Sequence, residues 1–205
     1  MITALSYLLF SSSTLFFSTS AFGFGAHLNS SKILKPGDYD LSGYSQFFSS
    51  DRRGAFIATA ADLPFTDDTN WRINAGAGSF DFSFGGQLKW VPVKEGEDRS
   101  KVSFGATVGA DYARDSGIDF YLFKTTPFVS KNLTWEYGSF EPYVAVPLGM
   151  IVANDRSDFY SQFIVGSHVR FEELDYMSFA IEGGFDIENS SSYLALMATI
   201  QLTQQ

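Results

Sequence analysis

The sequence has no cysteine, only two histidines and few basic residues, and each shortage excludes a kind of site. Without cysteine there is no disulfide framework, no thiol nucleophile and no thiolate metal site. His27 and His168 are too few to build the usual histidine-rich zinc site. The 14 Lys and Arg against 23 Asp and Glu give a formal net charge of −9. A nucleic-acid-binding protein needs a basic face, so this charge balance excludes that class.

Long apolar runs are also missing after residue 36. The uncharged apolar stretch "PYVAVPLGMIVAN", for example, is too short for a spanning helix and nearer the ~9–11 residues of a membrane strand. What the chain does have is 22 Phe and 18 Gly, which suit strands and tight turns better than helices. Its 205 residues fit one domain of ordinary size.

The first 26 residues carry no charged side chain. An apolar core, "ALSYLLF" and "TLFF", is followed by the small-x-small sequences Thr19-Ser20-Ala21 and Ala21-Phe22-Gly23. This pattern predicts a cleaved signal peptide over residues 1–22, with an uncleaved membrane anchor as the alternative. Residues 23–36 are predicted to be a polar linker.

From residue 37 onward the chain alternates between apolar and polar side chains. In residues 101–113, for example, Phe104 and Val108 alternate with Ser103 and Asp111. A period of two is typical of strands with two unlike faces, and charged or Gly/Asn/Asp turns separate the segments. We therefore predict ten strands, with eight as the alternative. They cover about 37–48, 53–63, 70–77, 80–92, 101–113, 117–129, 139–153, 158–171, 176–187 and 192–203.

The position of the charges indicates which solvent each face meets. Charged residues cluster between the strands, as in "KEGEDRSK" and "ANDRSD", while the polar faces are mostly Gly, Ser, Thr and Gln. The opposite faces are large and aromatic, which suits acyl chains. A lipid-facing sheet must close because unpaired backbone groups are costly in hydrocarbon. The sequence thus predicts an all-β, antiparallel, up-and-down transmembrane β-barrel over residues 37–203.

In this pattern, from Gly37 to Leu202, the chain resembles the small outer-membrane β-barrel proteins of Gram-negative bacteria, the outer membrane protein beta-barrel domain group. The resemblance implies export through a signal peptide to the bacterial outer membrane. It also implies periplasmic chaperones and the barrel-assembly machinery as partners in biogenesis, and outer-membrane lipid and lipopolysaccharide as surroundings. The chain departs from the group by ending in Gln205 rather than an aromatic residue, and by short loops where the group has long outer ones.

Two sets of residues are candidates for roles in such a barrel. We expect Asp81 to face Asp111, and Glu182 to pair with His168 or Arg170. The predicted luminal polar network is Arg72, Asp81, Lys89, Lys101, Asp111, His168, Arg170 and Glu182. The predicted aromatic girdles are Trp71, Trp90, Tyr112, Phe159 and Phe171.

No residue set predicts a catalytic, cofactor or metal site. Ser167 and His168 are adjacent, and neighbours on a strand point to opposite faces, so they cannot form a nucleophile–base pair. We therefore expect a structural or adhesive barrel, or a narrow passive pore that luminal side chains close, because short loops offer no plug. The alternatives are a lipid-A-directed enzyme and a soluble periplasmic barrel that binds an apolar ligand.

Overall fold

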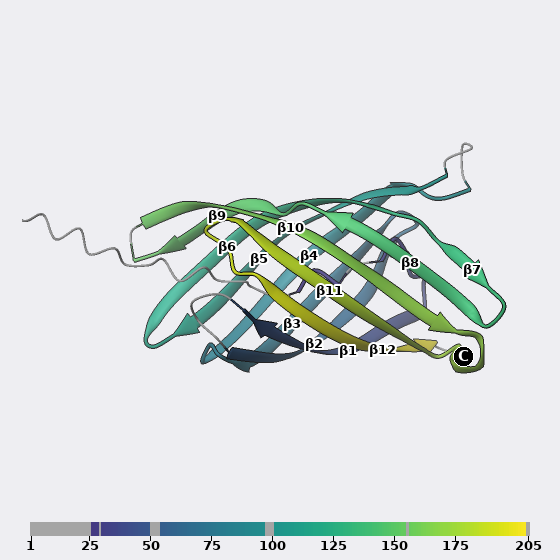
Figure 1. The fold of residues 1–205 in the computed structure, drawn as a ribbon, viewed down its shortest axis with the longest axis horizontal. Helices are drawn as coiled ribbons and strands as arrows, with labels where there is room; N and C mark the ends of the chain where they lie inside the picture. Colours follow the sequence, from purple (N-terminus) through teal and green to yellow (C-terminus); the bar gives the residue numbers. More distant parts are fainter. Residues whose placement is uncertain (1–25, 29, 50–53, 97–100, 155, 204–205) are drawn as a thin grey trace, which may run out of the picture.

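The computed structural model describes residues 26–28, 30–49, 54–96, 101–154 and 156–203. The predicted signal peptide lies outside the described residues. The strands form one antiparallel sheet that closes on itself, because β12 pairs back with β1 from Asp38↔Thr203 to Phe48↔Tyr193 (Figure 1). The strands are β1 Asp38–Phe48, β2 Gly54–Thr66, β3 Thr69–Gly78, β4 Phe82–Val93, β5 Ser103–Asp115, β6 Ile118–Ser130, β7 Leu133–Trp135, β8 Gly138–Ala145, β9 Leu148–Ala153, β10 Arg156–Phe171, β11 Met177–Glu188 and β12 Tyr193–Thr203.

These strands make a closed barrel of ten, which confirms the predicted fold class and strand number. β8 and β9 both pair with β6 and β10, so they are one barrel strand that is interrupted at Val146-Pro147. The sequence predicts this strand as continuous over 139–153. β7 pairs only with β8, and the two form a hairpin that extends the wall at the end where the C-terminus lies (Figure 1). We call this end, where β1 starts and β12 ends, the terminal end.

Short turns join β2 to β3 at the terminal end and β5 to β6 at the opposite end. At the end opposite the terminal end, Ser116 (φ 53°) and Gly117 (φ 80°) form a two-residue hairpin turn between β5 and β6. Positive φ at both positions is the geometry that matches the twist of paired strands, and glycine adopts it without strain. A short 3-10 turn, Glu172–Leu174, joins β10 and β11. Among the described residues, no helix is long and apolar enough to cross a membrane.

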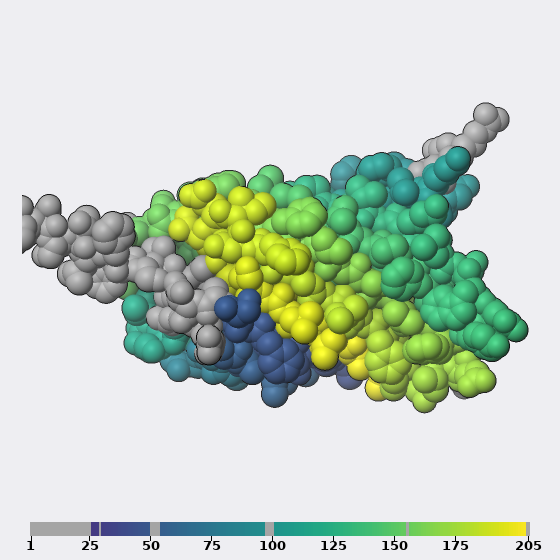
Figure 2. Space-filling model, in the orientation of Figure 1, coloured from purple at the N-terminus to yellow at the C-terminus, as the bar shows by residue number. Residues whose placement is uncertain are grey.

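The two faces of the wall differ in chemistry. On β5, Thr107 is buried inside while Val108 is 57% exposed on the outside. The outer face carries large apolar side chains on every barrel strand, as lipid contact requires. Figure 2 shows this wall continuous over β10, β11 and β12 in green and yellow. All five predicted girdle residues point outward. Trp71, Trp90 and Phe171 lie near the terminal end, and Tyr112 and Phe159 lie near the opposite end.

The lipid-facing assignment predicts that a charge at the middle of β5 is costly. Val108→Arg should lower the free energy of unfolding by roughly 2–4 kcal/mol, the cost of arginine at the bilayer midplane. Urea unfolding of the protein in lipid vesicles measures this change in the free energy of unfolding. Glu173→Arg, in the exposed 3-10 turn, is the control and should change stability by less than about 0.5 kcal/mol. Equal midpoints for the two variants would contradict the assignment.

Candidate functional site in the lumen

The N-terminal residues of the described chain, which belong to the stretch predicted as a polar linker, lie inside the barrel. We call residues 26–28 and 30–34 the plug segment, which is the purple trace within the ring of strands in Figure 1. Lys35 and Asp38 close the turn that follows it, with Asp38 N donating to Lys35 O at 3.0 Å. Pro36 and Gly37, the latter at φ 93°, are the usual central pair of a type II turn. The turn folds the plug segment back beside β1.

One carboxylate holds the deep part of the plug segment. Glu182 on β11 is fully buried and accepts the backbone N–H groups of His27 and Leu28, each at 2.6 Å. The hydroxyls of Tyr193, at 2.6 Å, and Tyr143 donate to the same two oxygens. The four donors compensate the burial of the charge, which would be costly without partners.

An arginine donates hydrogen bonds to the backbone carbonyl groups of the same two residues. Arg72 Nη1, on β3, donates to the carbonyl oxygens of His27 at 3.0 Å and Leu28 at 3.3 Å. Asp62 on β2 receives Nε at 2.8 Å and Nη2 at 2.7 Å from the other side of the guanidinium. This two-point contact fixes the orientation of the guanidinium plane and neutralises its charge.

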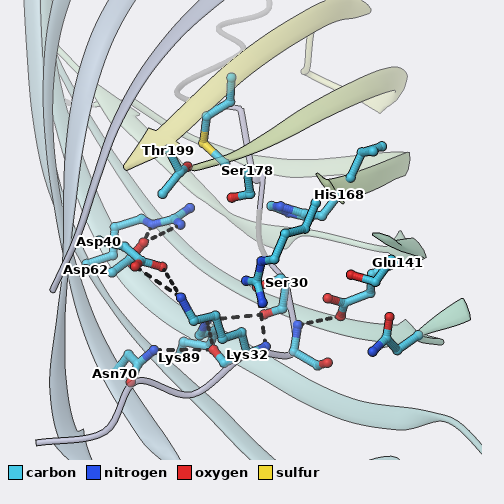
Figure 3. Close-up of a pocket in the computed structure, with 17 residues that line it drawn as sticks. Ser30, Lys32, Asp40, Asp62, Asn70, Lys89, Glu141, His168, Ser178 and Thr199 are labelled. Atoms are coloured by element: carbon cyan, nitrogen blue, oxygen red, sulfur yellow. Dashed lines mark hydrogen bonds and ion pairs between the residues drawn. The ribbon is translucent and has the colours of Figure 1, made fainter. Parts of the chain in front are cut away.

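Further anchors follow the plug segment toward the terminal end (Figure 3). Lys89 Nζ donates to the carbonyl oxygens of Ser30 at 3.2 Å and Lys32 at 2.6 Å. Asn70 accepts from Leu34 N at 3.1 Å. Lys32 forms an ion pair with Asp40 at 3.0 Å, so one plug side chain also bonds to the wall.

Two more wall side chains accept amides of the plug segment. Gln46 Oε1 accepts from Ala26 N at 3.1 Å, and Glu141 Oε1 accepts from Ser31 N at 2.7 Å. Apolar contacts complete the fit, since Leu28 and Leu34 are 1% and 2% exposed. The plug segment is therefore packed into the lumen as part of the fold.

The wall of β4, β5 and β6 carries a second polar cluster. Lys124 Nζ lies 2.9 Å from Asp111 Oδ2, and both side chains are buried. Near this ion pair, Gln87 Oε1, Thr107 Oγ1 and Thr126 Oγ1 are buried and have no hydrogen-bond partner among the described residues.

A cavity of about 240 Å³ lies beside the plug segment toward the terminal end (Figure 3). Its lining is polar and includes Lys89, Glu141 and Ser178. His168 also lines it, and its Nε2 atom has no partner in the described part of the chain. Exposed Arg170 is at its rim.

The structure places most of the predicted luminal network inside, but with other partners. Arg72, Lys89, Asp111, His168 and Glu182 face the lumen, and Arg170 lies at its rim. Asp81 and Lys101 differ from the prediction, because both lie exposed in turns beyond the ends of β4 and β5.

The predicted pairs also differ. In the sheet register the residue opposite Asp111 is Gly85, so Asp81 is too far along the chain to face it. Glu182 bonds to the plug segment and two tyrosines rather than to His168 or Arg170.

Sequence reasoning missed the plug segment and the residues that hold it. Asp62, Asn70, Lys124 and Tyr143 all occupy inward positions on their strands, and the alternation of the strand faces is the signal that could have indicated them. No signal in residues 26–34 could have revealed the plug segment, because its contacts are made mainly by backbone groups that every residue has.

The remaining candidates give no catalytic arrangement. Ser167 and His168 lie on one strand, and Ser167 Oγ donates to His168 O rather than to its ring. Within the described residues, no group of three His, Cys, Asp or Glu side chains could hold a metal ion.

Comparison with known proteins places the fold. No protein-family model and no curated protein matches this chain. It is similar in structure to an outer membrane channel from Pseudomonas putida F1, with a TM-score of 0.52 and 9% identity over 87% of this chain and 100% of that one. The fold is that of an outer-membrane β-barrel.

Two further structures that match have lower scores. LpxR from Salmonella typhimurium aligns with 82% of this chain and 100% of its own, at 7% identity and a TM-score of 0.44. Ail, the attachment invasion locus protein of Yersinia pestis, aligns with 82% of this chain and 100% of its own, at 11% identity and a TM-score of 0.31.

The Glu182 contacts predict a large loss of stability when the carboxylate is removed. Glu182→Ala leaves two backbone N–H groups and two tyrosine hydroxyls without their acceptor. We expect a fall of at least about 3 kcal/mol in the free energy of unfolding, since each unpaired buried group costs roughly 1–3 kcal/mol. Glu141→Ala, which frees one amide, should cost only about 1 kcal/mol. The stabilities of the two variants are compared by urea titration, with tryptophan fluorescence as the signal. If Glu141→Ala lowers stability as much as Glu182→Ala does, Glu182 is not the main anchor of the plug segment.

Proposed function

We propose that this chain is an outer-membrane pore for small ions that its own N-terminal plug segment keeps closed. The observation that carries the proposal is the path of the plug segment, whose backbone is bonded to wall residues such as Glu182, Arg72 and Lys89. The likeness to the fold of an outer-membrane channel supports a location in the outer membrane. The proposal includes no catalytic role.

The chemistry of the lumen favours a passage over a permanent seal. Asp62, Arg72, Lys89, Asp111 and Glu182 are all at most 7% exposed. Replacing buried ion pairs by packed apolar side chains is often neutral or stabilising, so a lumen that only had to stay shut would not need these charges. Ionisable residues inside a membrane protein commonly mark a pathway for ions or substrates.

The wall of β4, β5 and β6 supports the same conclusion. Gln87 Oε1, Thr107 Oγ1 and Thr126 Oγ1 have no hydrogen-bond partner in the described part of the chain, which includes the plug segment. Water that entered an open lumen would satisfy these oxygens, which lowers the cost of the open state. The exposed outer face, which carries large apolar side chains on every barrel strand, disfavours the alternative of a soluble barrel holding an apolar ligand.

The size of the barrel limits what could pass. Ten strands about 4.8 Å apart and tilted ~40° give a backbone radius of roughly 10 Å, and inward side chains reduce it. Open aqueous channels belong to barrels of about 16 to 18 strands. We therefore propose passage of small ions but not of disaccharides.

The test uses the full chain with a protease site inserted between Lys35 and Pro36, which are exposed at the terminal end. The protein is folded, cut, and freed of the plug segment by a mild urea wash, with the loss verified by mass spectrometry. In planar bilayers the uncut protein should be silent, whereas the plug-free barrel should conduct small ions.

The control carries the same site between Ser116 and Gly117 at the opposite end, and it should remain silent after cutting. A plug-free barrel that is also silent would overturn the pore and support a structural barrel instead, the second candidate, which the dense packing of Leu28 and Leu34 favours. Swelling of plug-free liposomes in a disaccharide would contradict the proposed size limit.

The proposal also implies an orientation. We expect the terminal end to face the periplasm, as the resemblance to outer-membrane barrels implies. Single cysteines at Ser116 and at Asp175, in the turns at opposite ends, report it with a membrane-impermeant thiol reagent on whole cells. Labelling should occur at position 116 only, and the reverse pattern would show that the barrel is inserted the other way.

A further inference from the structure

The lumen recognises the plug segment chiefly through its backbone. The wall accepts the N–H groups of Ala26, His27, Leu28, Ser31 and Leu34, and it donates to the carbonyl oxygens of His27, Leu28, Ser30 and Lys32. Backbone groups are common to all peptides. We propose that the lumen is a binding site for short peptide segments in general, and that the plug segment is its built-in occupant. This inference rests on the proposed closed pore and names the class of ligand that can replace the plug.

The centre of the site is a clamp formed by Glu182 and Arg72. Glu182 accepts both N–H groups of the His27-Leu28 pair, and Arg72 donates to both carbonyl groups of the same pair. The two side chains come from β11 and β3, which lie four strands apart round the closed ring. Each residue of the pair is thus held at both of its backbone polar groups from different parts of the wall.

The clamp is organised by the wall and not by the ligand. Asp62 holds the guanidinium of Arg72 at two points, and the hydroxyls of Tyr143 and Tyr193 hold the carboxylate of Glu182. Because these partners belong to the barrel strands, the arrangement persists when the plug segment is withdrawn. A preorganised site loses less entropy on binding, so a free peptide can bind it.

The side chains of the plug segment contribute less to its recognition by the lumen than its backbone does. Leu28 and Leu34 are buried, so the site prefers apolar residues at these two places. Lys32 adds an ion pair with Asp40. Proline is excluded at positions 27 and 28, because it lacks the N–H that Glu182 accepts. The ligand class is therefore a peptide of about nine residues that turns at the place of Leu28, where φ is 37°, with leucine-like side chains at two positions and little other sequence requirement.

The experiment uses the full chain cut between Lys35 and Pro36 after folding, so that the barrel forms with its plug segment attached. Exchange is followed by the fluorescence anisotropy of a labelled synthetic peptide with the sequence of residues 26–34. This peptide should bind the plug-free barrel with saturation. A peptide with alanine everywhere except the two leucines should bind within about tenfold of it.

Backbone methylation distinguishes main-chain recognition from general apolar binding. N-methylation at His27 and Leu28 removes the two N–H groups that Glu182 accepts, and it should weaken binding at least tenfold. N-methylation at Ile33 is the matched control, because no hydrogen bond from that amide is found in the described structure, and it should leave the affinity within threefold. On the barrel side, Glu182→Gln should weaken binding of the unmodified peptide and reduce the difference between the methylated peptides.

The outcomes separate this inference from the pore. Absence of peptide binding, or equal effects of methylation at 27–28 and at 33, would overturn the inference, and a conducting plug-free barrel would then leave the pore intact. Strong binding by a plug-free barrel that does not conduct would support the peptide site and overturn the pore. Loss of binding in the alanine peptide would show that side chains, rather than the backbone, decide recognition.

Discussion

Backbone N–H and C=O groups cannot be left unpaired in hydrocarbon, and the rest of this structure depends on that constraint. The pairing of β12 with β1 meets it, since it closes the sheet and leaves no edge in the wall. Closure separates an outer face of large apolar side chains from an inner face where polar and charged side chains lie beside a buried apolar cluster that includes Phe56, Phe120 and Leu122. Closure of ten strands also creates a lumen that is too wide for small side chains alone to fill.

The plug segment fills this space under the same constraint. Many of its amide and carbonyl groups are bonded to side chains of the wall in place of water. These bonds come from Glu182, Arg72, Lys89 and Asn70. The charges of the first three side chains are compensated by the plug segment and by neighbours such as Asp62. The buried charges and the plug segment thus stabilise one another. The closed state of the lumen is thereby coupled to the position of one short segment.

The strand positions were accessible from the sequence because alternation is a local property. The predicted span of 101–113 is 103–115 in the structure, and 192–203 is 193–203. The errors occur where the alternation of apolar and polar residues continues beyond the residues that pair in the sheet. Asp81 and Lys101 have the parity of luminal residues, but the paired strands begin after them. The strand predicted over 139–153 is broken at Pro147, which has no N–H to donate to its neighbours.

By itself, the sequence determined that the chain forms an all-β barrel, which face meets lipid, and where most charged side chains point. These properties follow from a period of two and from the exclusion of charge from hydrocarbon, and both act over a few residues. Only the tertiary structure decided what occupies the lumen and which residues Glu182 and Arg72 bind. Those contacts join positions about 45 to 155 residues apart and use backbone groups that carry no sequence signature, so they arise only when the closed barrel brings its strands around the segment.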